Sequence, residues 1–424
     1  MQTGLEGTHR LHDTARFARC RLSNGITVWL QKTDIMVDHE GYLSMFFKNV
    51  GSANDPRGLD GLAHFLEHML FRKSFTHDSE TALKDFVVSN GGEINARTNA
   101  EFTEYYVMLD TAHFSEALQS LHSLVCEPVF DLQDVVLESK IILQEFLKSK
   151  ARSSFLVGEH IRRFLLAKND PFNHAVLGNP ATIKRISQQD IYDFYHKYYH
   201  TGNANIICGG SFARIPNVLE ELEMAFGMMC KGKTCEPVFY AGSAIKSGNH
   251  RFLDKRYPNE NLSIQYCLPV LTYEERIPLM LLLESLAGRT GAPFDTEVRI
   301  MRGLTYHIDA EVITNHFESL IDVECELDSN NFELVNEIFL EKLATLSEEC
   351  ILKYVKSIQQ ERLIKFQHPI SACKSVVSEI VYFGKSISCR EHERLIDETD
   401  ITDIFAWKNE LQSTRQRVLE LRIK

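Results

Sequence analysis

Apolar runs bounded by turn residues alternate along the chain with longer segments of helical periodicity. In the first half, runs of this kind predict strands at residues 26–31, 43–50, 107–109 and 205–208. Apolar positions that recur every three or four residues predict helices at residues 112–124, 132–150 and 188–199. Strands and helices of this length in mixed order predict an α+β unit.

The second half repeats this order loosely. The same criteria predict strands at residues 261–268 and 318–326, and helices at residues 277–286, 332–346 and 347–366. The pattern breaks into small, basic and turn residues between the halves, so we expect a junction at residues 229–240. The predicted fold is therefore two similar α+β domains, residues 1–228 and 241–424, each a mostly antiparallel sheet packed with helices.

Composition narrows the function classes. The 424 residues carry 46 lysines and arginines against 58 acids, a formal charge of −12, which argues against nucleic-acid binding. No apolar run is long enough to cross a membrane, and the first residues contain no apolar signal segment. Ten cysteines, several of them in apolar runs, indicate free thiols and a cytoplasmic protein.

The informative chemical pattern is GLAHFLEHMLF at residues 61–71, which contains His64, Glu67 and His68 as H-x-x-E-H. Residues four apart share one face of a helix, so both imidazoles can bind one ion. Neutral imidazoles suit Zn²⁺, and the ion lowers the pKa of a water that a carboxylate such as Glu67 can deprotonate. Because the flanking residues are apolar, three polar groups without partners would be expensive here, and a metal site is favoured over an exposed polar face.

A catalytic zinc needs a third protein ligand. The predicted helix 132–150 offers Glu138 and Glu145, which are seven residues apart and share one helical face. Either carboxylate could bind the ion, and either could instead pair with a lysine or arginine. The spacing alone does not choose between them.

The residues from Gly51 and Asp55-Pro56 through GLAHFLEHMLF resemble the inverzincin zinc peptidases, the group of pitrilysin, insulysin and the mitochondrial processing peptidases. In that group a glutamate about 70–80 positions after the second histidine is the third ligand. Glu145 follows His68 by 77 positions. The resemblance therefore implies one zinc ion per chain, bound by His64, His68 and Glu145, with Glu67 as general base. It also implies that Glu138 does not bind the ion itself but supports the residues that do.

The same resemblance implies a substrate-binding edge strand around Asn95, Ala96, Arg97 and Thr98. An exposed edge offers unpaired backbone groups, to which a peptide can add as a further strand. Asn95 would contact the peptide near the scissile bond. Arg97 would favour an acidic neighbour in the substrate.

In the second half, Arg299 and Tyr306 stand seven apart around Gly303-Leu304, as in the family's C-terminal domain. The resemblance implies that Tyr306 donates to the developing oxyanion and that Arg299 holds the peptide backbone, both reaching across the chamber from the same chain or from a partner. Short members build their peptide chamber from two chains, so we expect a homodimer, or a heterodimer with a similar subunit. The expected activity is zinc-dependent hydrolysis of peptides or unfolded segments, including leader or processing peptides.

Two features qualify this interpretation. The family often has F-K-G-T where this chain has Phe71-Arg72-Lys73-Ser74, and we expect this loop to lie outside the metal site. The alternative to an enzyme is a non-catalytic peptide-binding or structural subunit of the same fold. Such relatives typically lose the metal or base residues, whereas here they are present.

The sequence also contains a match to the consensus of a phosphate-binding loop. Residues 227–234, GMMCKGKT, fit G-x-x-x-x-G-K-T, but a P-loop must follow a strand and open a helix. Here a helical pattern precedes the motif, and Pro237 stands where the helix should continue. We therefore interpret the segment as part of the junction.

Overall fold

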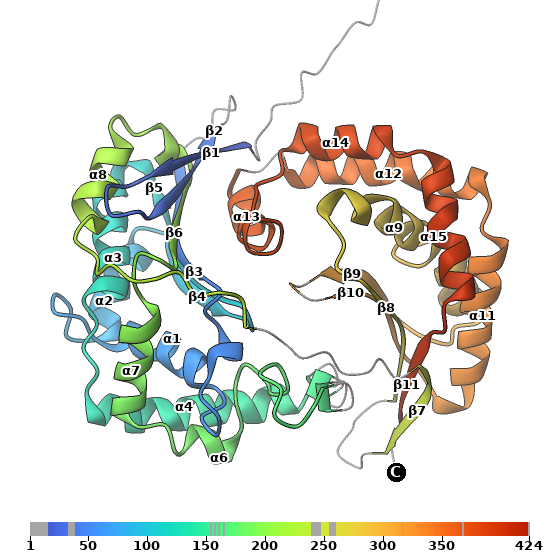
Figure 1. Cartoon of the computed structure of the whole chain (residues 1–424), viewed down its shortest axis with the longest axis horizontal. Coiled ribbons are helices and arrows are strands. Elements are labelled where there is room, and N and C mark those ends of the chain that lie inside the picture. The colour runs from blue at the N-terminus through green and yellow to red at the C-terminus, as the bar shows by residue number, and fades with distance from the viewer. Residues whose placement is uncertain are drawn as a thin grey trace, which may run out of the picture.

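The computed structural model describes residues 16–32, 39–152, 155–156, 158–159, 162–163, 166–238, 247–253, 260–314, 316, 318–366 and 369–422. Two sheet-and-helix domains lie side by side, and the two sheets face the middle of the molecule (Figure 1). This confirms the predicted α+β fold class.

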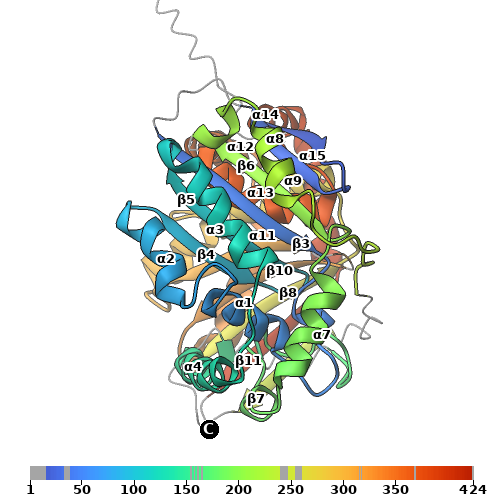
Figure 2. The ribbon, with the colours of Figure 1, turned by 90° about the vertical axis from the view of Figure 1, so that its left-hand side faces the viewer.

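The first domain contains a six-stranded sheet. Its strands are β1 (Arg16–Arg21), β2 (Thr27–Lys32), β3 (Glu40–Lys48), β4 (Glu93–Thr98), β5 (Phe102–Asp110) and β6 (Ala204–Gly210). Its helices are α1 (Leu62–Arg72), α2 (Glu80–Ser89), α3 (Phe114–Cys126), α4 (Leu132–Lys150), α6 (Pro180–Ile183), α7 (Gln188–Tyr198) and α8 (Val218–Phe226). Helices α2, α3, α7 and α8 lie on the outer side of this sheet (Figure 2).

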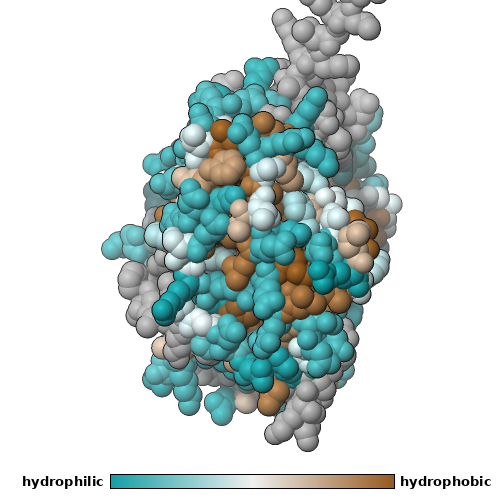
Figure 3. All heavy atoms as spheres, turned by 90° about the vertical axis from the view of Figure 1, so that its right-hand side faces the viewer, coloured by the Kyte–Doolittle hydropathy of each residue, from teal (hydrophilic) through white to brown (hydrophobic). Residues whose placement is uncertain are grey.

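The second domain contains a five-stranded sheet. Its strands are β7 (Gly248–Leu253), β8 (Asn261–Leu268), β9 (Ile308–Thr314), β10 (Ser319–Glu326) and β11 (Arg417–Arg422). Its helical elements are α9 (Tyr273–Leu286), α10 (Pro293–Asp295), the π-helical turn η4 (Thr296–Met301), α11 (Phe332–Thr345), α12 (Glu348–Phe366), α13 (Pro369–Phe383), α14 (Cys389–Glu398) and α15 (Ile401–Ser413). Hydrophilic and apolar side chains interleave on its outer face (Figure 3).

The two sheets share one topology. The first has the order β1-β2-β6-β3-β5-β4 and the second β7-β11-β8-β10-β9, so the second matches the first without β1. The pairings agree as well, because β2–β6 and β7–β11 are parallel and the corresponding remaining pairs are antiparallel. The two halves are therefore two copies of one unit, as their element order suggested.

Each domain also sends a segment across to the other domain's sheet. Helix α13 packs on the open face of the first sheet, in a buried cluster where Cys373, Val377 and Ile380 join Trp29 and Phe46. Between α4 and α6, Phe155 and Leu156 pack against Phe252 and Leu421 of the second sheet. This exchange gives the two domains a shared apolar interface.

The expected junction falls after α8. Residues 230–238 contain no helix or strand, and residues 239 and 240 lie outside the described residues. Among the described residues, no helix combines the length and the apolarity that crossing a bilayer requires.

Candidate metal centre and active site

Helix α1 begins at a tight approach between two loops. Gly61 has φ +96°, and a Cβ there would lie 2.9 Å from Cα of Gly178. The Asp55 carboxylate accepts hydrogen bonds from the N–H groups of Gly61 and Ala63, at 2.6 and 2.8 Å, which satisfies donors at the start of the helix. Glycine and Asp55 therefore fix the end of α1 from which the first histidine projects.

His64 and His68 lie one turn apart on α1, with ring centroids 4.7 Å apart. The Glu145 carboxylate of α4 faces both rings. Its Oε2 lies 3.8 Å from Nε2 of His64 and 3.5 Å from Nε2 of His68. The ligand atoms of the three residues all lie within 4.8 Å of one another, which is close enough for them to share one metal ion.

The donor set fits zinc. Two imidazoles and one carboxylate form the three-ligand set of a catalytic zinc site. The Nδ1 atom of His64 is buried and has no hydrogen-bond partner among the described residues, and its Nε2 faces Glu145. His68 places Nδ1 2.9 Å from Oε2 of Glu138, which fixes the ring and directs Nε2 toward Glu145.

The surroundings of His64 and His68 shift the pKa values of the two imidazoles in opposite directions. Burial, aided by the neighbouring His68, lowers the pKa of His64 to about 4, so this ring is neutral at pH 7. Burial also acts to lower the pKa of His68, but hydrogen bonds to Glu138 and Glu145 outweigh it and raise the value to about 9. Metal binding must therefore displace a proton from His68 and not from His64.

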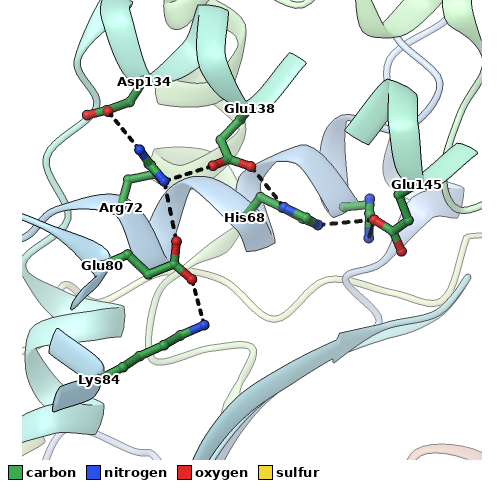
Figure 4. A network of polar contacts seen from close by, with 8 residues as sticks. His68, Arg72, Glu80, Lys84, Asp134, Glu138 and Glu145 are labelled. Carbon is green, nitrogen blue, oxygen red and sulfur yellow. Dashed lines mark hydrogen bonds and ion pairs between the residues drawn. The ribbon is translucent and has the colours of Figure 1, made fainter. Parts of the chain in front are cut away.

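Glu138 belongs to a wider network of charges (Figure 4). Its Oε1 lies 3.3 Å from Nη1 of Arg72, and the same guanidinium contacts Glu80 at 3.3 Å and Asp134 at 3.5 Å. The Glu138 side chain is only 3% exposed, so the pairing with Arg72 offsets part of the cost of burying the carboxylate. The expectation that residues 71–74 lie outside the metal site is wrong for Arg72, because α1 continues through it and brings it to the carboxylate that holds His68.

Glu67, on the same helix as His64 and His68, reaches the edge of the sheet. Its Oε2 accepts a hydrogen bond from the hydroxyl of Thr98 on β4. Burial raises the pKa of Glu67, while Thr98 and His68 act to lower it. The carboxylate is thus held against the last residue of the edge strand.

Strand β4 is an edge strand, since it pairs only with β5 among the described strands. Thr98 and the partly buried Ala96 lie on the face toward α1, whereas Asn95 is exposed on the other face. Arg97 shares the face of Asn95, and its guanidinium donates to the buried Glu104 at 2.7 Å and to the Lys374 carbonyl at 2.8 Å. Its side chain ties the edge strand to α13 and is already committed to those partners.

Arg299 and Tyr306 lie elsewhere in the chain. Arg299 pairs with Asp295 at 2.6 Å, and Tyr306 is 95% exposed. Within the described residues of one chain, no hydrogen bond or ion pair joins either of them to His64, Glu67, His68 or Glu145. Among the described residues, the structure therefore brings together the predicted residues of the first domain, and it shows no direct polar contact between them and Arg299 or Tyr306.

Sequence reasoning missed Arg72 and Asp134. The signal was available, because His64, His68 and Arg72 are spaced four apart on one helix, as are Asp134 and Glu138 on another. Two such faces carrying opposite charges predict a paired helix interface.

Fold and site together define the class of protein as metallopeptidase-like. Residues 39–176 match the family model described as "Insulinase (Peptidase family M16)". Residues 185–358 match the model described as "Peptidase M16 inactive domain". The chain belongs to peptidase family M16.

Relatives agree with this assignment, and solved structures share the fold. An "Uncharacterized zinc protease" of Rickettsia bellii is 24% identical over 406 residues, which cover 93% of this chain and 94% of that protein. A similar protein of Bacillus subtilis is 23% identical and covers 71% and 72% of the two chains. The fold matches a protease from Helicobacter pylori with a TM-score of 0.85 at 16% identity, over 96% and 99% of the chains, and pitrilysin with 0.73 at 20%, over 96% and 44%.

Proposed function

We propose that this protein is a zinc metalloendopeptidase that hydrolyses peptide bonds in peptides or unfolded segments, including leader or processing peptides. The observation that carries the proposal is the convergence of His64, His68 and Glu145 within 4.8 Å, beside Glu67, which is held against an edge strand. An edge strand accepts extended peptides with little demand on sequence, so the proposal covers a class of substrate and no single one.

Each of these residues of the first domain has a separate role in the proposed mechanism. His64, His68 and Glu145 would hold the zinc ion, which when bound would lower the pKa of a water molecule and polarise a carbonyl. Glu67 would accept the proton of the attacking water and pass it to the leaving amine. Glu138 keeps His68 oriented through Nδ1. The peptide lies along β4, where Asn95 and the backbone of Ala96, Arg97 and Thr98 hold it in register.

Tyr306 and Arg299 complete the site from a second copy of the chain or a similar subunit. Tyr306 donates to the oxyanion and Arg299 holds the peptide backbone. Two observations support a partner as their source: the 95% exposure of Tyr306, and the lack of any hydrogen bond or ion pair to the metal-binding residues in the described part of one chain. Residues 1–228 then act as the catalytic domain and residues 241–424 as the domain that supplies this pair.

The alternative is a non-catalytic peptide-binding or structural subunit. The description of residues 185–358 as an inactive domain bears on this choice. However, the metal-binding residues and Glu67 all lie in residues 39–176, outside that match. The presence of the full set favours the enzyme.

The free cysteines support a reducing compartment. Nine cysteines in the described residues are free, and Cys208, Cys325 and Cys373 are buried. We propose the cytoplasm as the site of action.

The experiment is mass spectrometry of products from a library of unstructured peptides, with and without a zinc chelator. The wild type cleaves, and the chelator stops it. Glu67→Gln keeps its zinc and loses turnover by about a hundredfold or more, because only the base is removed. Glu333→Gln, at an exposed position on α11, is the matched control and cleaves as the wild type does. Cleavage by Glu67→Gln at the wild-type rate overturns the mechanism, and no cleavage by any variant favours the non-catalytic subunit.

A further inference from the structure

A cavity of about 390 Å³ lies at the open face of the first sheet, away from the residues proposed to bind zinc. Strands β1, β2, β3 and β6 contribute to it, together with residues 201 and 202 before β6, residues 232 and 234 of the junction, and Ile380 and Gly384 at the end of α13. Three separate parts of the chain therefore meet around one space.

Three cations line this cavity: Arg19, Arg21 and Lys48. None of the described lining residues is acidic, and none of the three cations forms an ion pair with a carboxylate in the described part of the chain. The carboxylate of Glu223 on α8 accepts hydrogen bonds from Ser23 and does not line the cavity. In a protein with a formal charge of −12, this is a local concentration of uncompensated positive charge.

The positions of the cations leave donors available. The Arg19 guanidinium lies 5.8 Å from the centre of the Trp29 ring, and the Arg21 side chain is exposed. Lys48 uses one N–H on the Ile380 carbonyl, at 3.2 Å, and an ammonium has three. Burial and the nearby Arg19 lower the pKa of Lys48, so the two cations repel each other. An anion in the cavity would relieve this repulsion.

The junction contributes backbone and hydroxyl groups to the lining of the cavity. Gly232 and Thr234 line the cavity, and both belong to the GMMCKGKT segment. Residues 230–238 form neither a helix nor a strand, so the segment is not a P-loop. It nevertheless brings a glycine and a threonine to the lining of the cavity.

We propose that this cavity binds a phosphate-type oxyanion, such as a phosphate or diphosphate group of a small molecule. A phosphate group carries close to two negative charges and three acceptor oxygens, which suits several cations better than one carboxylate does. Guanidinium groups bind phosphate through two parallel hydrogen bonds, and Arg19 and Arg21 supply two such groups.

Binding there would join both domains. Arg19, Arg21 and Lys48 belong to the first sheet, Thr234 to the junction, and Ile380 to a helix of the second domain. A ligand that binds only the folded arrangement raises the unfolding temperature, and the rise grows with the logarithm of the ligand concentration divided by Kd. The site is therefore independent of peptide hydrolysis and can be tested without measuring activity.

The experiment is titration of the full chain with inorganic phosphate and with pyrophosphate at constant ionic strength, by calorimetry and by thermal unfolding. Pyrophosphate is expected to bind, to raise the unfolding temperature, and to bind more tightly than citrate at equal ionic strength. Arg19→Gln with Arg21→Gln should weaken binding by at least about tenfold, because each removes charged hydrogen bonds. Both side chains are exposed, so the variant should fold. Arg185→Gln removes an exposed arginine outside the cavity and should bind as the wild type does.

Three outcomes overturn the proposal. The first is no binding of either probe. The second is binding that survives unchanged in the double variant, since pyrophosphate chelates metal and would then be bound at the zinc site. The third is equal affinity for citrate, which would mean a general attraction for anions.

Discussion

The hydroxyl of Thr98, the last residue of the edge strand β4, donates a hydrogen bond to Oε2 of Glu67 on α1. The residue proposed as general base is thus tied to the strand proposed to hold the substrate. Because β4 and α1 are far apart in sequence, the contact aligns two elements that must act on the same peptide bond.

The first prediction concerns Thr98. Thr98→Val keeps the shape and removes the donor, so turnover should fall by about tenfold to a hundredfold while KM changes little. Thr98→Ser restores the hydroxyl and should restore most of the turnover. Steady-state kinetics on one cleaved peptide measures both. A Thr98→Val enzyme with full turnover would remove this contact from the mechanism.

The second prediction concerns Arg72. Arg72→Met removes one of the two cations beside the buried Glu138 and leaves His68 as the other, so the metal-free protein should lose about 2 kcal/mol of unfolding free energy. Zinc affinity should fall by about tenfold to a hundredfold, because Glu138 then holds His68 less firmly. Urea unfolding and chelator competition measure the two effects.

Lys84→Met is the control for Arg72, since Lys84 pairs with Glu80 at the edge of the same network. Its cost should stay below about 1 kcal/mol, with unchanged zinc affinity. Equal effects of the two substitutions would show that Arg72 has no special part in the metal centre.

The third prediction concerns pH and the second sheet. Burial, with Asp322 nearby, raises the pKa of Glu324 to about 7, above its unfolded value of 4.5. The folded state therefore holds this proton more tightly, and stability should fall as the pH rises from about 4.5 through 7. Glu324→Gln should be more stable than the wild type at pH 8, by up to about 3 kcal/mol, and should differ little at pH 4.5.

Chemical denaturation at both pH values tests this, with Glu333→Gln as the exposed control. Asn261 donates to Oε1 of Glu324 at 2.7 Å, and a glutamine can keep that bond. A Glu324→Gln variant that is less stable than the wild type at pH 8 would contradict the raised pKa.

The fourth prediction concerns the source of Tyr306. If the partner chain supplies it, Glu67→Gln and Tyr306→Phe are each inactive alone but share one intact site in a mixed dimer. Co-refolding equal amounts should restore about a quarter of the wild-type activity, as expected for random pairing. Activity no greater than that of the separate variants would mean that each chain uses its own Tyr306 or none.

The sequence predicted that His64 and His68 share one face of α1, and their rings do lie together, because residues four apart are one turn apart on a helix. It could not distinguish Glu138 from Glu145 by spacing, because both carboxylates project from one face of α4. The structure distinguishes them through the atoms they meet: Oε2 of Glu145 faces Nε2 of both rings, while Glu138 lies between Nδ1 of His68 and Arg72.

Contacts between segments that are distant in the chain could not be predicted from the sequence. Arg97 donates to the carbonyl of Lys374, 277 residues away, and local patterns carry no information about such a partner. Strand β11, RVLELR, mixes charged and apolar residues, and it becomes a central strand only because β7 and β8 flank it. Tertiary packing decides such elements.

The most direct test of the account is anomalous scattering at the zinc edge from crystals of the zinc-loaded protein. The account predicts one strong peak per chain, about 2.0–2.2 Å from Nε2 of His64, Nε2 of His68 and a carboxylate oxygen of Glu145. A peak bound to other residues, or none near this cluster in protein that has bound zinc, would contradict it.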